Sequence, residues 1–424
     1  MKNVSITLLL LSVLILIMTT GCKKDPEPSL YDPNYVSGPQ PIIERMDPPD
    51  SSYAGVGTID VYGKYFIPKE PYEEYNQLYF NEVMADILQM TDSKITIASP
   101  AYIGDSIKVK IAVRGSDKFS EPVYYKLKAA VDTTFGRLDD FKQKRIAYAI
   151  ATDSKGNVYV STRVETTPPF GQILRINKQG EPTIWVDNTV YLKANAMKVG
   201  PNNKLYVAYA LGRIKEIATI DLADSTLQET YTRLATVPND IDFDQDGNLW
   251  VAAQTELVKV KPDRSKETLA TFSLFLQSIR VHEEGGTTYI YLTGQNLEQN
   301  EQKVWRYPLN DDGSIGAEEI ILDAATDSWL VKEDGNLVDI KAITFSADGK
   351  MYLATDMSPD ALVIYDMTTR TYDFQYPGLI KPKLLALSWF GNIIYASQTN
   401  FGETDANVLR IDVGKSGAPY YGRQ

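Results

Sequence analysis

The sequence predicts an all-β protein in which a β-sandwich is followed by a six-bladed β-propeller. Three observations lead to this prediction: a phrase that occurs six times, a matching further strand after each copy, and an N-terminal stretch of short alternating strands without helical periodicity. Each copy of the phrase is an apolar strand, a polar turn and a second strand with an aromatic residue near its start. Repeats of this length with several short strands are typical of propeller blades.

The repeated phrase defines the blades. Its copies occupy residues 149–163, 196–210, 241–254, 278–295, 342–357 and 384–400. Their aromatic residues lie 47, 44, 41, 61 and 43 positions apart, at Tyr159, Tyr206, Trp250, Tyr291, Tyr352 and Tyr395. A further strand follows each copy, at 173–176, 216–221, 257–261, 304–307, 362–365 and 408–411. Six phrases with six partners predict six blades, which we place in residues 146–424.

The third copy shows how the phrase works. Ile241 and Phe243 alternate with Asp242 and Asp244, which is the period of a half-buried strand. The turn at 245–248 is rich in Asp, Gly and Asn, which tolerate positive φ. The pattern D-x-x-G-N-[LV]-[WY]-V-[AS] resembles NHL-type propellers, and it is also similar to calcium-dependent lactonase propellers. In this context we interpret the turn aspartates as turn formers.

The stretch 39–130 has no blade phrase. It contains the short alternating runs 58–66, 78–83, 94–98 and 106–113, separated by turn signals. The stretches IDVYGKYF (59–66), LYF (78–80), ITIASP (95–100) and VKIAVRG (109–115) resemble an IPT/TIG domain in order and spacing. The resemblance implies an immunoglobulin-like (Ig-like) β-sandwich, and residues 131–145 are then expected to form a linker to the propeller.

The N-terminus reads as a targeting segment. A basic residue at Lys2 precedes an apolar stretch at 8–18 that is short for a permanent membrane span. Residues 19–22, ending in the chain's single cysteine, Cys22, resemble a bacterial lipobox, although Thr19 stands where Leu is usual. The resemblance implies a lipoprotein signal peptide at 1–21 and lipidation of Cys22. The charged, proline-containing residues that follow predict a tether at 22–38. An acidic residue soon after Cys22 resembles the export signal of lipoproteins in the outer membrane that face the cell surface.

Composition limits the function classes. The formal charge is −12 and the chain has no long basic run, which argues against a nucleic-acid partner and leaves the lipid anchor as the expected membrane contact. With one histidine and one cysteine, the usual zinc sites and the Ser-His-Asp and Cys-His nucleophile systems are excluded or nearly so. These counts favour a non-enzymatic protein without a cofactor.

The propeller face that carries the blade-to-blade connections is the expected ligand site. The residues entering the inner strands should border the channel: Tyr148, Asn195, Asn239, Gln277, Lys341 and Lys383, with Asp240 and Asp339 beside them. Unusual aromatics lie in loops expected on the same face, at Phe170, Trp329 and Phe401. Amides, carboxylates and an aromatic surface suit sugar hydroxyls and C–H faces. Alternatively, these polar groups satisfy one another and channel water.

Three functions remain open. An anchor, an Ig-like spacer and a distal propeller resemble surface lipoproteins of polysaccharide-uptake systems, which implies a glycan or oligosaccharide ligand and outer-membrane transporter components as partners. A calcium-dependent lactonase-like hydrolase is the second possibility. Asn195, Asn239, Asp240 and Asp339 could supply oxygen ligands, although the glutamate needed from another blade is represented only by Glu165 or Glu333. A protein–protein scaffold is the third.

Overall fold

A computed structural model of the chain describes residues 34–400, 402 and 406–423. The predicted signal peptide, Cys22, most of the tether and Phe401 lie outside these residues. The chain divides into two compact units, one ending at Lys126 and one beginning at Leu127, with Ala101–Ile103 assigned to the second. Within the described ranges, no helix has the length and apolarity needed to cross a membrane.

The first unit is a β-sandwich, as predicted. One sheet has the strand order β1 (Ile42–Asp47), β3 (Thr58–Lys64), β7 (Lys94–Ala98) and β6 (Ile87–Met90). The other has the order β2 (Ser51–Tyr53), β9 (Val123–Lys128), β8 (Gly104–Val113), β4 (Asn76–Phe80) and β5 (Val83–Met84). A short helix, α2 (Tyr72–Tyr75), leads into β4. Alternate residues such as Ile59 and Val61 of β3 and Leu78 of β4 are fully buried, so the apolar side of each strand forms the core.

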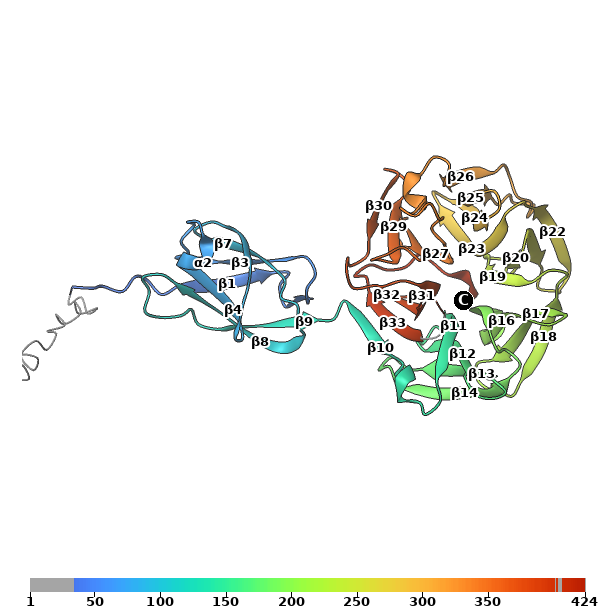
Figure 1. Cartoon of the computed structure of the whole chain (residues 1–424), viewed down its shortest axis with the longest axis horizontal. Coiled ribbons are helices and arrows are strands. Elements are labelled where there is room, and N and C mark those ends of the chain that lie inside the picture. The colour runs from blue at the N-terminus through green and yellow to red at the C-terminus, as the bar shows by residue number, and fades with distance from the viewer. Residues whose placement is uncertain (1–33, 401, 403–405, 424) are drawn as a thin grey trace, which may run out of the picture. The chain divides into compact units, whose positions relative to one another are not determined.

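The second unit is a propeller of six four-stranded sheets, which confirms the predicted fold class (Figure 1). The first sheet contains β11 (Arg145–Thr152), β12 (Val158–Val164), β13 (Phe170–Ile176) and β14 (Pro182–Thr189). The second contains β15 (Ala194–Gly200), β16 (Lys204–Leu211), β17 (Ile214–Asp221) and β18 (Gln228–Arg233). The third contains β19 (Pro238–Phe243), β20 (Leu249–Ala253), β21 (Glu256–Val260) and β22 (Lys266–Thr271).

The remaining three sheets follow the same plan. They are β23 (Phe275–Glu284), β24 (Thr287–Asn296), β25 (Glu301–Pro308) and β26 (Glu319–Asp323); β27 (Ala342–Phe345), β28 (Met351–Ala354), β29 (Leu362–Asp366) and β30 (Thr371–Phe374); and β31 (Leu384–Phe390), β32 (Ile393–Thr399), β33 (Ala406–Asp412) and β10 (Val131–Phe135). Apolar clusters fill the spaces between neighbouring sheets, and one of them joins the first blade to the sixth.

The expectation that residues 131–145 form only a linker is wrong. Val131–Phe135 is strand β10, which pairs antiparallel with β33 as the outermost strand of the sixth blade. Phe135 is 3% exposed, and its ring lies 5.1 Å from that of Tyr395. The ring of blades is therefore closed by a strand that precedes the first blade in the chain, and this strand pairs with the edge that β33 would otherwise leave open.

The segment after β33 was not expected to have a separate role, but it crosses the channel. Figure 1 shows the C-terminal end at the centre of the ring. Tyr420 donates its hydroxyl proton to Val199 O (2.6 Å), and Arg423 donates to Thr152 O (2.9 Å) and to Trp389 O (2.7 Å). The tail therefore bridges the first, second and sixth blades at the ends of their inner strands.

Hydrogen bonds explain why the blade phrase couples a turn aspartate to an aromatic residue. In the third blade, Asp244 accepts hydrogen bonds from the backbone N–H of Asp246 and Asn248. The same carboxylate accepts the indole N–H of Trp250 at 2.8 Å. Asp153 holds its own turn and Tyr159 in the same way. These aspartates act as turn formers that also orient the buried aromatic ring of the next strand.

Candidate ligand site in the central channel

A cavity of about 200 Å³ lies in the centre of the propeller, and all six inner strands contribute to it. Six of the predicted channel residues line it, namely Tyr148, Asn195, Asn239, Asp240, Gln277 and Lys341. Five of them occupy the equivalent position of the repeat, near the start of an inner strand, and Asp240 follows Asn239 on the same strand. Closure of the ring therefore brings these repeat positions together around the channel. Phe275, which the sequence analysis missed, also lines the cavity and is 44% exposed.

The amides at the rim connect the second, third, fourth and fifth blades by hydrogen bonds. Asn195 donates to Pro238 O at 2.8 Å, and Asn239 donates to Leu276 O at 2.7 Å. Gln277 donates to the carboxylate of Asp339 at 2.6 Å. Part of their hydrogen-bonding capacity is therefore structural, as the alternative interpretation proposed. An amide offers four hydrogen-bonding positions, so such anchoring also holds the rest of each group in a defined orientation.

Asp339 and Lys383 do not line the cavity, but Asp339 contacts two residues that do, Gln277 and Lys341. The Asp339 carboxylate lies 2.9 Å from the Lys341 ammonium and 3.9 Å from the Lys383 ammonium. It also accepts a hydrogen bond from the side-chain amide of Gln277. This cluster joins the fourth, fifth and sixth blades.

A layer of charged residues lies deeper in the channel, and the sequence analysis did not identify it. One inner-strand residue pairs with each repeated aromatic. In blades two, three and four these residues are Lys198, Asp242 and Arg280, opposite Tyr206, Trp250 and Tyr291. In blades five and six they are Thr344 and Ser388. The signal was present as a polar residue opposite the repeated aromatic residue in five of the six blades.

The charged layer is buried and strongly coupled. Asp240 accepts hydrogen bonds from Arg280 Nη1 (2.7 Å), Ser278 Oγ (2.6 Å) and the Ile279 N–H (3.1 Å). Burial opposes the charge of Arg280, but the carboxylates of Asp240 and Asp242 outweigh this effect and raise its pKa. Burial raises the pKa of Asp242. Burial and the neighbouring Arg280 guanidinium lower the pKa of Lys198 to about 8.

Two of the aromatic residues proposed from the loops, Trp329 and Phe170, do not line the cavity. Trp329 lies in a short 3-10 helix (Ser328–Leu330) and stacks on Tyr372, with ring centres 4.6 Å apart, and on Tyr365 at 6.4 Å. Its indole therefore packs against the two outer strands of the fifth blade. Phe170 begins β13 and pairs with Val164 at the sheet edge. The loops were placed by their position in the repeat, which does not determine the direction of a side chain.

The residues proposed for calcium do not form a suitable ligand set. The Asp240 carboxylate is occupied by Arg280, and that of Asp339 by two lysines. Glu165 pairs with Arg163, and Glu333 is exposed. Across residues 34–400, 402 and 406–423, no group of three or more His, Cys, Asp or Glu side chains is arranged to hold a metal ion. A divalent cation would have to displace the ammonium and guanidinium groups that these carboxylates already hold.

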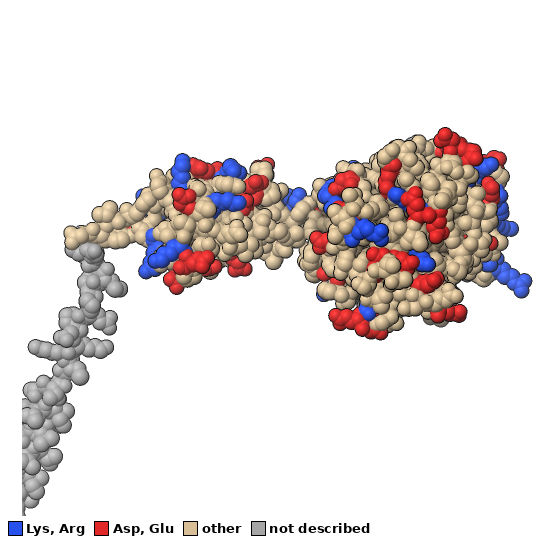
Figure 2. Space-filling model, turned by 90° about the horizontal axis from the view of Figure 1, so that it is seen from above, with Lys and Arg blue, Asp and Glu red and all other residues tan. Residues whose placement is uncertain are grey.

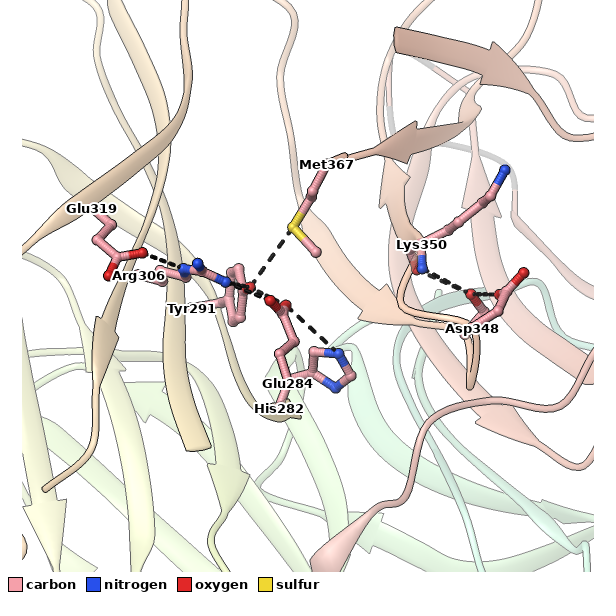
Figure 3. A network of polar contacts seen from close by, with 9 residues as sticks. His282, Glu284, Tyr291, Arg306, Glu319, Asp348, Lys350 and Met367 are labelled. Atoms are coloured by element: carbon pink, nitrogen blue, oxygen red, sulfur yellow. Dashed lines mark hydrogen bonds and ion pairs between the residues drawn. The ribbon is translucent and has the colours of Figure 1, made fainter. Parts of the chain in front are cut away.

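The single histidine belongs to a polar network between the fourth and fifth blades (Figure 3). His282 stacks on Phe345, with ring centres 4.1 Å apart and planes within 3°. Glu284 accepts hydrogen bonds from Tyr291 and Arg306, and Arg306 also pairs with Glu319 at 2.7 Å. The network links all four strands of the fourth blade. Because all of these contacts are internal to the protein, we interpret the network as one that stabilises the blade.

The outer surface differs from the channel in charge. In Figure 2, acidic and basic side chains are interspersed on the visible side, without a broad basic field. The cavity is lined by four cations, Lys193, Lys198, Arg280 and Lys341, and by one carboxylate, Asp240. A chain with net charge −12 therefore has a cation-rich lining at its centre.

Comparison with protein-family models and with curated protein sequences gives no match. Among solved structures, a putative phosphatase from Bacteroides thetaiotaomicron has a TM-score of 0.53 at 10% identity, covering 90% of this chain and 98% of that one. A protein of unknown function from the same bacterium has a TM-score of 0.48 at 13% identity, covering 90% and 100%. A gluconolactonase from Xanthomonas campestris has a TM-score of 0.48 at 11% identity, covering 73% and 91%. The first similarity supports the fold alone.

Proposed function

We propose that the propeller binds a saccharide in the central cavity and performs no catalysis. The observation that supports this most directly is the convergence of anchored amides, cations and an exposed aromatic ring on one cavity. Sugar hydroxyls need donors and acceptors held in fixed positions, and the C–H face of a sugar ring packs on an aromatic surface. Phe275 is the aromatic residue suited to this packing.

The size of the cavity indicates how much of a glycan enters. Pockets for drug-sized ligands have volumes of about 300–1,000 Å³, and this cavity has about 200 Å³. It suits one sugar unit at the end of a chain, with the rest of the glycan outside.

Binding is favoured over hydrolysis because the carboxylates of the cavity are already engaged. Asp240 and Asp339 are held by cations, so neither is placed as a metal ligand or a free general base. A calcium-dependent hydrolase would need both roles filled. A protein scaffold would not need a cavity at the centre of the ring.

A glycan screen with the chain lacking residues 1–22 tests the proposal. We expect retention of at least one polysaccharide on an affinity gel, and about fivefold weaker retention by Phe275→Ala, since stacking of one ring contributes on the order of 1 kcal/mol. Tyr124→Ala removes an aromatic ring that is 64% exposed in the sandwich and should leave retention unchanged. Retention of no polysaccharide, or equal loss in both variants, would reject the proposal.

We also propose that the chain is a lipoprotein anchored through Cys22 in an outer membrane, where it holds glycan near transporter components. The support is the lipobox-like sequence before Cys22 and the charged, proline-containing stretch after it. Metabolic labelling with a fatty acid should mark the wild-type chain and not Cys22→Ser. Labelling of both proteins would contradict the anchor, and protease accessibility on intact cells tests whether the protein faces the surface.

A further inference from the structure

Lys198 is a buried cation without a close protein partner. It lies in the middle of β15 and is 8% exposed. Its ammonium makes no ion pair or hydrogen bond within the described residues, and it lies 5.5 Å from the centre of the Tyr420 ring. An ammonium group carries three donors, and burying it without partners is costly. Such a group indicates a missing binding partner.

The position of Lys198 makes it reachable from the ligand site. It lines the central cavity of about 200 Å³ and also a smaller cavity of about 40 Å³ beneath it, next to the C-terminal tail. Arg280 and Leu387 also line both cavities. Lys198 therefore belongs to the floor of the ligand cavity.

The carboxylates near Lys198 are engaged by other groups. Lys198 interacts with Arg280 of blade four, with Arg423 of the tail and with the carboxylates of Asp240 and Asp242 of blade three. Asp240 is paired with Arg280 at 2.7 Å, and Arg423 interacts with Asp242 and also with Asp153 of blade one. Within the described residues, none of these carboxylates forms an ion pair with the Lys198 ammonium.

We propose that the cavity recognises a sugar that carries a carboxylate, a uronic acid, with Lys198 binding the carboxylate at the floor and Phe275 packing against the ring at the mouth. This inference rests on the proposed saccharide binding and narrows it to acidic glycans. A carboxylate in the cavity would give Lys198 the charge-assisted hydrogen bonds that the protein does not supply.

Binding of this kind has a pH signature. The pKa of Lys198, about 8 in the free protein, is expected to rise when a carboxylate binds, since an opposite charge favours the protonated form. Binding at pH 8–9 should then take up protons, and binding at pH 6.5 should not. Affinity should fall as pH rises above 8. Asp240, Asp242, Arg280 and Arg423 are the charged groups facing Lys198, and Tyr420 is the neutral one.

The test compares uronate polymers with their carboxyl-reduced forms, in which each carboxylate has become a primary alcohol. Polygalacturonate, alginate and hyaluronan serve as probes for the chain lacking residues 1–22. We expect at least one to bind, with loss of binding on carboxyl reduction. Lys198→Met should bind at least tenfold more weakly and show no proton uptake at pH 8.5 by calorimetry in buffers of different ionisation enthalpy, while Lys198→Arg should recover part of the affinity.

Controls separate charge at the floor from charge elsewhere. Lys155→Met removes an exposed lysine in a turn of the first blade and should bind like wild type. Lys198→Met removes a buried charge, so it should fold with equal or higher stability, which thermal unfolding checks.

The outcomes are distinguishable. Equal binding of native and reduced polymers, or retention of neutral glycans alone, overturns the uronate inference and leaves saccharide binding intact. Binding of small carboxylates such as lactate, without any glycan, supports the anion site and rejects saccharide binding. No binding of any probe rejects both.

Discussion

Asp240 neutralises the buried guanidinium group of Arg280 in the central channel. One of its carboxylate oxygens accepts hydrogen bonds from Arg280, Ser278 and the Ile279 N–H, and the residue is 6% exposed. Removing one member of a buried ion pair leaves the other uncompensated. Asp240 therefore holds the third and fourth blades together and keeps Arg280 neutralised.

We predict that Asp240→Asn lowers the free energy of unfolding by about 3–5 kcal/mol, because Arg280 would lose its closest counter-charge. Denaturant unfolding of the full chain measures this change. Asp246→Asn, the same substitution in an exposed turn of the same blade, should change stability by no more than about 0.5 kcal/mol. Similar losses in both variants would show that the channel ion pair contributes no more to stability than an exposed carboxylate does.

Burial of His282 should make the folded protein less stable at acidic pH. It is 6% exposed, and burial lowers its pKa below the ordinary value. When pH falls below about 6.5, the unfolded chain takes up the proton before the folded one does, so stability falls with acidification. The melting temperature of wild type should drop more between pH 7.5 and 5.5 than that of His282→Gln, since the other titrating groups are common to both proteins. Parallel curves would contradict this.

The rim of the site could be predicted from the sequence, and its floor was missed. Rim residues such as Asn195 and Asn239 occupy equivalent repeat positions, so alignment of the repeat was enough to group them. Lys198 was overlooked because the side chain at its repeat position changes from blade to blade among cation, carboxylate and hydroxyl, so alignment of the repeat shows no common chemistry there. Trp329 lies away from the cavity because its side chain stacks on Tyr365 and Tyr372, a contact that the repeat does not predict.

At the scale of elements, the six repeats could be predicted because each blade is a local pattern of strands and turns. Strand β10 could not, since its partner β33 lies at the other end of the propeller sequence. Its own sequence has only five residues and no blade phrase. The C-terminal tail was missed for a similar reason: its partners Val199, Thr152 and Trp389 come from three different blades.

We expect the side chain of Phe135, on the closing strand β10, to contribute strongly to stability. Phe135 is buried against Tyr395, and Phe135→Ala should cost about 3–5 kcal/mol of stability through lost burial and a residual cavity. Chemical denaturation measures the loss. Leu227→Ala, a truncation at a residue that is 60% exposed, should have little effect and serves as the control. A neutral Phe135→Ala would mean that β10 contributes little to holding the ring closed.

At the scale of the whole molecule, the two units have separate cores. The sandwich buries Leu78 and Phe80, and the propeller buries its own clusters between sheets. Units with their own cores can unfold independently.

We therefore predict two thermal transitions by calorimetry. Leu78→Ala should lower one of them by about 8 °C or more, since such truncations cost about 2–5 kcal/mol, and should leave the other in place. Leu88→Ala, at a sandwich residue that is 51% exposed, should move neither by more than a few degrees. A common shift of both transitions would show that the units unfold as one.

Pairing of β10 with β33 has a consequence for how the protein is made. On the ribosome, β10 emerges before any blade has been translated, and its sheet is completed only when β31, β32 and β33 follow. Until then its hydrogen-bonding edge and Phe135 have no native partner. A nascent chain halted after the fifth blade would therefore expose an open ring and an unpaired strand at the same time, which makes this stage of translation the one most in need of a chaperone.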